Sequence, residues 1–186
     1  MIHYYTNREI SEKLKVNLAR WKRWSRAFLP PDPLGGMQSG YARQYLFKDL
    51  FKVYLGGHLI SHHKLTVPEG CHLLADLAPW LKRMGFLDVN GSHTRLPENA
   101  DPGVPILVFF APRGSPDGKS RAGFDYLVHR HIAGSGTKRG HLSVRESDLN
   151  GEPLDGKAFF MQPDIHVINI SVLRATLLEC LQDPHR

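Results

Sequence analysis

The chain has 186 residues and a mass of 21.0 kDa, enough for one domain of about 150 residues or for two small ones. Its hydrophobic fraction of 41% and charged fraction of 23% are typical of globular proteins, and no apolar run approaches the roughly 20 residues of a membrane helix. A bilayer-spanning helix is therefore excluded. Because residues 1–6 lack the basic-then-apolar order of a secretory signal, we expect a cytoplasmic protein without a membrane partner.

The excess positive charge lies in the first half of the chain. Residues 1–88 contain 13 Lys and Arg against 7 Asp and Glu, a net charge of +6, whereas residues 89–186 contain 11 of each. Residues 1–31 alone carry seven basic side chains. A local basic stripe is what neutralisation of DNA phosphates requires, although a solvated helix face produces the same pattern.

Two short helices are predicted near the N-terminus. Thr6 and Glu9 have the spacing of a capping box, and Asn17 is suited to cap a second helix that extends to Phe28. The apolar residues of this second helix recur at helical spacing: Leu18, Trp21, Trp24 and Phe28. The basic residues fall on the opposite face: Arg20, Lys22, Arg23 and Arg26. The pattern predicts a helix-turn-helix whose aromatic stripe packs inward.

The next elements complete a mostly helical first domain, residues 1–87. Residues 29–40 hold three prolines and three glycines, which favours a loop or β-ribbon, and residues 41–46 are its predicted returning strand. A helix is predicted from Phe47. The capping box of Thr66 and Glu69 predicts another helix that ends at Gly85.

The second half of the chain has the pattern of an antiparallel sheet. Residues 88–103 have the composition of a linker. Residues 104–186 form a predicted second domain with strands at 104–111, 124–132, 141–145, 157–162 and 165–170. A helix at 172–181 is expected to cover one face of the sheet, so the whole chain is predicted to be α+β.

Residues 5–86 resemble the DNA-binding domain of the MerR family of winged helix-turn-helix regulators. Val16 ends the turn, Trp24 follows eight residues later where the family has an aromatic residue, and the family's Arg-Tyr pair falls on Lys22-Arg23. The segment that leaves the helix also matches: Phe28-Leu29-Pro30-Pro31. The wing signature matches with one extra residue: Gly40-Tyr41-Ala42-Arg43-Gln44-Tyr45. The resemblance implies a homodimer on a pseudopalindromic promoter site, with RNA polymerase as an indirect partner.

The resemblance and the charge pattern together predict the DNA contacts. Residues 17–28 would lie in the major groove and residues 29–45 on the flanking backbone. Arg20 or Arg23 is suited to bidentate contact with guanine, while Asn17 would cap the helix or read adenine. The remaining predicted contacts are Lys22 and Arg26 on the helix and Tyr41 and Arg43 on the wing.

Other side-chain patterns are weaker. His58 and His62 have the i, i+4 spacing of a bidentate metal site, but polar surface or capping histidines are the expected outcome. Residues 113–121 lack the glycine order of a P-loop and are read as a hairpin loop. Without a catalytic triad, paired carboxylates or a dinucleotide fingerprint, we predict no enzyme, no cofactor and no metal.

The sequence thus predicts a transcription regulator that binds double-stranded DNA, with a C-terminal domain that binds a small-molecule effector, mediates association, or both. The family's long dimerisation helix is replaced here by the predicted linker, so a dimer would use the sheet or the last helix. Two alternatives stay open. One is a monomeric architectural DNA-binding protein similar to phage excisionases, and the other is an enzyme or interaction module in the C-terminal domain that the N-terminal half targets to DNA.

Overall fold

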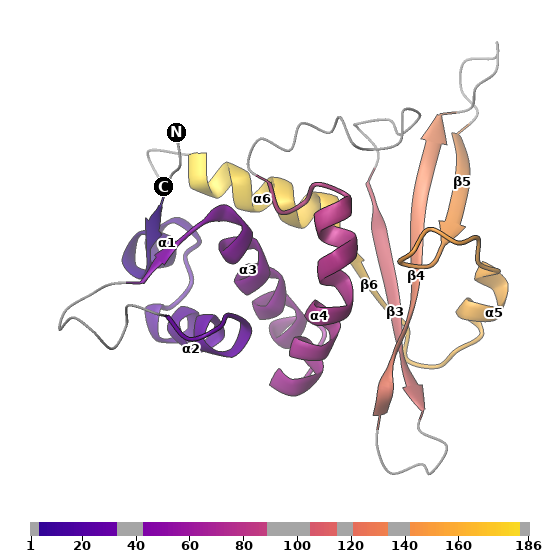
Figure 1. Cartoon of the computed structure of the whole chain (residues 1–186), viewed down its shortest axis with the longest axis horizontal. Helices are drawn as coiled ribbons and strands as arrows, with labels where there is room; N and C mark the ends of the chain where they lie inside the picture. The colour runs from indigo at the N-terminus through magenta and orange to yellow at the C-terminus, as the bar shows by residue number, and fades with distance from the viewer. Residues whose placement is uncertain (1–3, 33–42, 89–104, 115–120, 134–141, 183–186) are drawn as a thin grey trace. The chain divides into compact units, whose positions relative to one another are not determined.

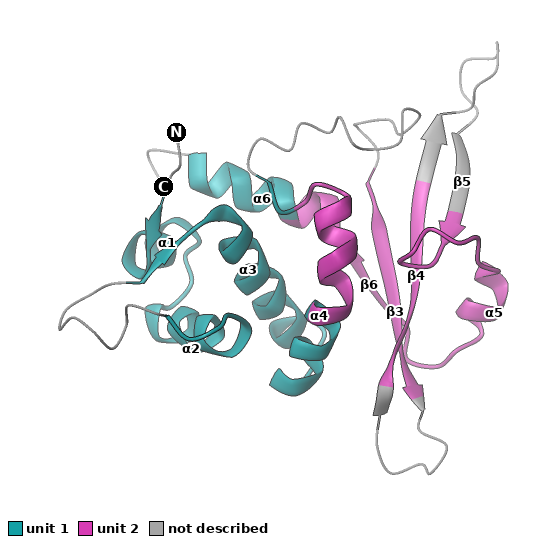
Figure 2. Ribbon diagram, in the orientation of Figure 1, with its two compact units in different colours: residues 1–74, 87–89, 174–186 teal, residues 75–86, 90–173 magenta. Residues whose placement is uncertain are grey.

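The computed structural model describes residues 4–32, 43–88, 105–114, 121–133 and 142–182, and combines helices with antiparallel strands (Figure 1). Its contacts divide the chain into two compact units (Figure 2). Unit 1 contains Met1–Leu74, Leu87–Val89 and Arg174–Arg186, and unit 2 contains Ala75–Phe86 and Asn90–Leu173. In the part of the chain that the structure describes, no helix is long and apolar enough to cross a membrane. The predicted linker lies outside the described residues except for Asp88.

Four helices follow the N-terminus: α1 (Asn7–Lys13), α2 (Leu18–Phe28), α3 (Phe47–Ser61) and α4 (Val67–Arg83). Both predicted capping boxes are confirmed. The Thr6 hydroxyl accepts from the Glu9 amide while the Glu9 carboxylate accepts from the Thr6 amide at 2.7 Å, and Thr66 and Glu69 repeat the arrangement. Past α4, Gly85 adopts φ +72°, a left-handed conformation that stops a helix.

The apolar face of α2 packs against α3 within unit 1. Trp21 is fully buried and Trp24 is 9% exposed, as the stripe predicted, whereas Leu18 is exposed where the helix begins. The α3 backbone comes close to this face because two glycines lie there. A Cβ added at Gly56 would lie 2.5 Å from the Phe28 ring, and one at Gly57 would overlap the Trp24 ring. The two helices can therefore approach closely only because Gly56 and Gly57 have no side chains.

Two short strands join the start of the chain to the segment after α2. Strand β1 (Tyr5–Thr6) pairs antiparallel with β2 (Gln44–Tyr45), so that Tyr5 lies opposite Tyr45. The sequence predicted a strand at 41–46, and its partner, which the sequence left open, is the residue pair that precedes α1. Residues 33–42 lie outside the described part of the chain.

Unit 2 is built on a four-stranded antiparallel sheet of order β5-β4-β3-β6. The strands are β3 (Leu107–Gly114), β4 (Arg121–Ala133), β5 (Leu142–Ser147) and β6 (His166–Asn169). One face of the sheet is buried through Val108, Phe110, Val128 and Ile168. From the part of α4 that belongs to this unit, Asp76 accepts a 2.6 Å hydrogen bond from the Tyr126 hydroxyl.

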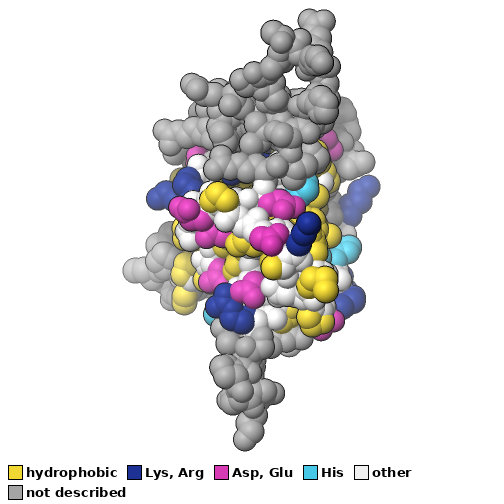
Figure 3. Space-filling model, turned by 90° about the vertical axis from the view of Figure 1, so that its right-hand side faces the viewer, with side chains coloured by type: hydrophobic (Ala, Val, Ile, Leu, Met, Phe, Trp, Pro, Cys, Tyr) yellow, Lys and Arg dark blue, Asp and Glu magenta, His cyan; other side chains and the backbone are white. Residues whose placement is uncertain are grey.

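The strand predicted at 157–162 is wrong, because residues Gly156–Phe160 form a short helix, α5. Asp155 caps it by accepting a 3.0 Å hydrogen bond from the Lys157 amide. The buried Phe159 then packs with Ala111 and Leu127 on the other face of the sheet. Figure 3 shows the face that carries α5, where apolar side chains are exposed among charged ones; Met161 is 86% exposed.

The last helix, α6 (Ile170–Gln182), includes the predicted residues 172–181 and is divided between the two units. From Arg174 on, it belongs to unit 1 (Figure 2). Arg174 is 7% exposed, and its guanidinium lies 5.6 Å from the centre of the Phe47 ring and donates to the Asp88 carbonyl at 2.7 Å. Unit 1 thus combines both ends of the described chain, and the domains 1–87 and 104–186 stay a prediction.

Candidate nucleic-acid interface

Helix α2 has a buried aromatic face and an exposed basic face. Trp21, Trp24 and Ser25 are buried on the inner side. The four predicted contact residues of the helix are all exposed: Arg20, Lys22, Arg23 and Arg26. The 100° step of an α-helix places Arg20 and Arg23 on one side of this outer face and Lys22 and Arg26 on the other. The structure therefore brings the predicted helix residues together as one cationic surface.

Asn17 caps α2. Its side-chain oxygen accepts from the Ala19 amide at 3.0 Å and from the Arg20 amide at 3.2 Å. This satisfies two of the donors that a helix leaves free at its first turn. Of the two roles that the sequence left open for Asn17, capping is the one for which the structure has hydrogen bonds.

The turn between α1 and α2 is held locally. Lys15 adopts φ +50°, an uncommon value for a residue with a Cβ. The Ser11 hydroxyl donates to the Val16 carbonyl at 2.8 Å, across the turn. The orientation of α2 with respect to α1 is thus fixed by short-range bonds as well as by the buried Ile10.

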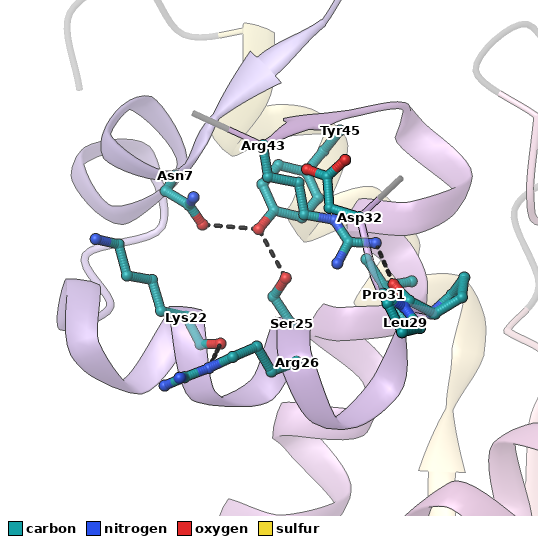
Figure 4. Close-up of a pocket in the computed structure, with 10 residues that line it drawn as sticks. Asn7, Lys22, Ser25, Arg26, Leu29, Pro31, Asp32, Arg43 and Tyr45 are labelled. Carbon is teal, nitrogen blue, oxygen red and sulfur yellow. Dashed lines mark hydrogen bonds between the residues drawn. The ribbon is translucent and has the colours of Figure 1, made fainter. Parts of the chain in front are cut away.

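A chain of hydrogen bonds links α1, α2 and β2 (Figure 4). The Tyr45 hydroxyl donates to the Asn7 side-chain oxygen at 2.7 Å and shares a 2.7 Å hydrogen bond with the Ser25 hydroxyl. Tyr45 is 1% exposed and Ser25 is 2% exposed. Burial raises the pKa of Tyr45 above its ordinary value, and the bond from Ser25 and the charge of Arg43 oppose that shift. The neutral phenol is therefore a fixed connection between the three elements.

Arg43 braces the segment around β2. Its guanidinium donates to the Pro30 carbonyl at 2.9 Å and lies 5.7 Å from the centre of the Tyr45 ring. Pro30 follows α2 and Arg43 precedes β2, so this bond joins the two ends of the segment 30–43. Arg43 is half-buried, and its role as a DNA contact stays a prediction. Tyr41, the other predicted wing contact, lies outside the described residues.

An open hollow of about 590 Å³ lies between α2 and β2; we call it the α2–β2 hollow (Figure 4). Its lining includes three cationic side chains, Lys22, Arg26 and Arg43, and one carboxylate, Asp32. Leu29 and two prolines that follow it form an apolar wall, and the hydrogen-bonded Tyr45 also contributes to the lining. The hollow thus groups two predicted site residues of α2 with Arg43, which is distant from them in the sequence, while Arg20 and Arg23 are not among its lining residues.

His58 of α3 forms a ring cluster with the two histidines that follow the helix. The His58 and His62 rings stack with centroids 4.4 Å apart, and the His63 ring meets His58 edge-on at 5.3 Å. Burial and the proximity of His62 lower the pKa of His58. Over the described residues, no group of three or more His, Cys, Asp or Glu side chains is arranged to hold a metal ion.

Asn7, Ser25, Asp32 and Tyr45 belong to this region although the sequence reading did not select them. Tyr45 could have been selected because it ends the wing signature. The places of Asn7, Ser25 and Asp32 depend on contacts between residues distant in the chain. No protein-family model and no curated protein matches the chain. What the chain does is therefore inferred from the geometry of α1, α2 and β2.

Proposed function

We propose that α1 and α2 act as the helix-turn-helix of a winged DNA-binding domain, and that the protein regulates transcription by binding double-stranded DNA. The observation that carries this proposal is the exposed cationic face of α2, held on a buried aromatic face. The proposed wing is the segment 29–45, whose described ends are joined by the bond between Arg43 and Pro30.

The dimensions of α2 support an approach to the major groove. Its 11 residues give a length of about 16 Å at 1.5 Å per residue, and a helix of ordinary diameter fits a groove about 12 Å wide. Arginine is the side chain best suited to bidentate contact with guanine. We assign Arg20 and Arg23 to the base edges, and Lys22 and Arg26, which border the segment leading to the wing, to the phosphates.

The second half of the chain, residues 89–186, has no net charge, since it carries equal numbers of acidic and basic side chains. We assign it to association or to effector binding. A dimer related by a two-fold axis would place two copies of α2 on successive major grooves, so the expected site is an inverted repeat.

The test is a selection of genomic DNA fragments by the full-length protein at about 0.15 M salt, followed by size measurement of the complex. We expect one inverted-repeat site to be enriched, with two chains bound. A complex of one chain with bent DNA would instead indicate an architectural DNA-binding protein. Absence of enrichment would refute sequence-specific binding.

Variants of α2 test the assigned face. Arg23→Ala and Arg20→Ala should weaken binding about 10-fold or more and change preference at single base pairs, while Lys22→Ala should weaken all sequences alike and lower the salt slope by about 1. Lys157→Ala is the matched control, because Lys157 is exposed on α5 and its substitution removes the same charge. Equal losses of DNA affinity in Lys157→Ala and Lys22→Ala would show that Lys22 contributes only through the net charge of the protein.

A further inference from the structure

The α2–β2 hollow has the size and lining of a small-molecule site. Its volume of about 590 Å³ falls within the range of ligand pockets, roughly 300–1,000 Å³. Such pockets combine an apolar wall with a few polar groups that fix orientation. Here Leu29, Pro30 and Pro31 supply the wall, Arg43 and Asp32 lie beside it, and Lys22 and Arg26 extend from α2 (Figure 4).

The charges of the hollow select the sign of the ligand. The lining contains three cationic side chains and one carboxylate, so its net charge is +2. The exposed Lys22 and Arg26 come from one turn of α2, and the guanidinium of Arg43 comes from the opposite side. The Arg43 guanidinium uses one donor on the Pro30 carbonyl, and a guanidinium has five. An anion is therefore the complementary ligand.

We propose that the α2–β2 hollow binds a small organic anion, a phosphate monoester or carboxylate on a flat apolar ring, about the size of a mononucleotide or smaller. A bare phosphate would leave the wall of Leu29 and the prolines without a partner. An uncharged ring would leave the cations without one. The ligand class follows from the two features together.

Binding there controls access to DNA, a consequence that rests on the proposed function. Lys22 and Arg26 line the hollow and also belong to the cationic face assigned to the duplex. An anion held by these two side chains neutralises charge that phosphate contacts need. The ligand and DNA therefore compete, and each lowers the affinity of the other by the same factor.

The test uses the full-length protein and phenyl phosphate as the probe, with inorganic phosphate and phenol as its two halves, all at constant ionic strength. Backbone amide shifts in NMR spectra report the location. We expect saturable shifts at Ser25, Leu29 and Asp32, with a dissociation constant of roughly 0.1–3 mM for a fragment of this size. Each half should bind at least about 10-fold more weakly, because it satisfies only one of the two features.

Arg26→Gln should weaken phenyl phosphate binding about fivefold or more, since one charge-assisted contact is lost. Arg8→Gln is the matched control; Arg8 lies on α1, pairs with Glu12 and is not among the lining residues. Equal loss in both variants, shifts elsewhere, or equal binding of inorganic phosphate would overturn the site.

Competition is measured separately by DNA titration with and without saturating phenyl phosphate. Competition is supported if phenyl phosphate lowers the DNA affinity of the native protein about threefold or more. In Arg26→Gln, the effect of phenyl phosphate on DNA affinity should be about one third of that or less. Unchanged DNA affinity overturns the competition. A protein that binds phenyl phosphate at the hollow but no DNA keeps the site and refutes the proposed function, whereas DNA binding without phenyl phosphate binding refutes the site alone.

Discussion

The hydroxyl of Tyr45 can be removed without changing the shape of the ring, which makes Tyr45→Phe a sharp test of the connection between α1, α2 and β2. In the native protein this hydroxyl bonds to Ser25 and to Asn7 at 2.7 Å each. Its removal leaves the Ser25 hydroxyl, 2% exposed, without that partner. Leaving a buried polar group unsatisfied costs about 1–3 kcal/mol, so we expect the free energy of unfolding to fall by that amount.

The double variant separates this hydrogen bond from ring packing. Ser25→Ala keeps the bond between Tyr45 and Asn7 and should cost about 0.5–1.5 kcal/mol. Tyr45→Phe with Ser25→Ala leaves no unsatisfied hydroxyl in the pair, so its cost should be less than the sum by about 1 kcal/mol. Urea unfolding followed by tryptophan fluorescence measures all three, because the Trp21 ring lies 5.8 Å from the Tyr45 ring. A cost below about 0.3 kcal/mol for Tyr45→Phe, or strict additivity, would refute the reasoning.

Three further changes test other parts of the fold. Asn17→Ala should lower the free energy of unfolding by about 1 kcal/mol through loss of the α2 cap, with Asn17→Asp restoring most of it, as measured by urea unfolding. Gly57→Ala should cost about 1–3 kcal/mol or more in thermal melts, because the added methyl group overlaps the Trp24 ring. Burial, and then the bond to Asp76, raise the pKa of the Tyr126 phenol well above its ordinary value of about 10. The folded state thus keeps a proton that the unfolded state loses, and stability should fall as the pH rises above about 10, less steeply in Tyr126→Phe.

Each of these changes has its own contrary result. Equal stability of Asn17→Ala and the native chain would mean that other groups satisfy the first turn of α2. A neutral Gly57→Ala would show that α2 and α3 separate easily, with Gly85→Ala as a control for conformational strain because Gly85 has open space but φ +72°. An identical alkaline slope for Tyr126→Phe would assign that slope to other groups.

Local signals were sufficient for the helices of the first half. The capping boxes at Thr6 and Thr66 and the cap at Asn17 involve residues two or three positions apart, so their hydrogen bonds can be predicted from the local sequence. The same is true of the two faces of α2, since helical periodicity separates Trp21 and Trp24 from the basic residues. The charge pattern and the resemblance to the MerR family together predicted a nucleic-acid interface on α2.

Non-local contacts explain what the sequence reading missed. Residues 157–162 were predicted to be a strand, but the cap from Asp155 and the packing of Phe159 on Leu127 select a helix. The α2–β2 hollow arises because the chain returns to Pro30 at Arg43 and to Tyr5 at Tyr45. Neither return is encoded in the spacing of nearby residues, so Asn7, Ser25 and Asp32 could not be selected in advance.

The division of the chain also orders its folding in time. Unit 1 includes residues up to Leu74 and residues from Arg174 on, with about a hundred residues of unit 2 between them. During synthesis at roughly 5–20 residues per second, the first helices leave the ribosome several seconds or more before the helix that completes their unit. Throughout that interval the surface around Phe47 that Arg174 later covers stays open to water and to chaperones. A nascent chain stalled before Arg174 should therefore be protease-sensitive in α3, although all of α1 to α4 has already been made.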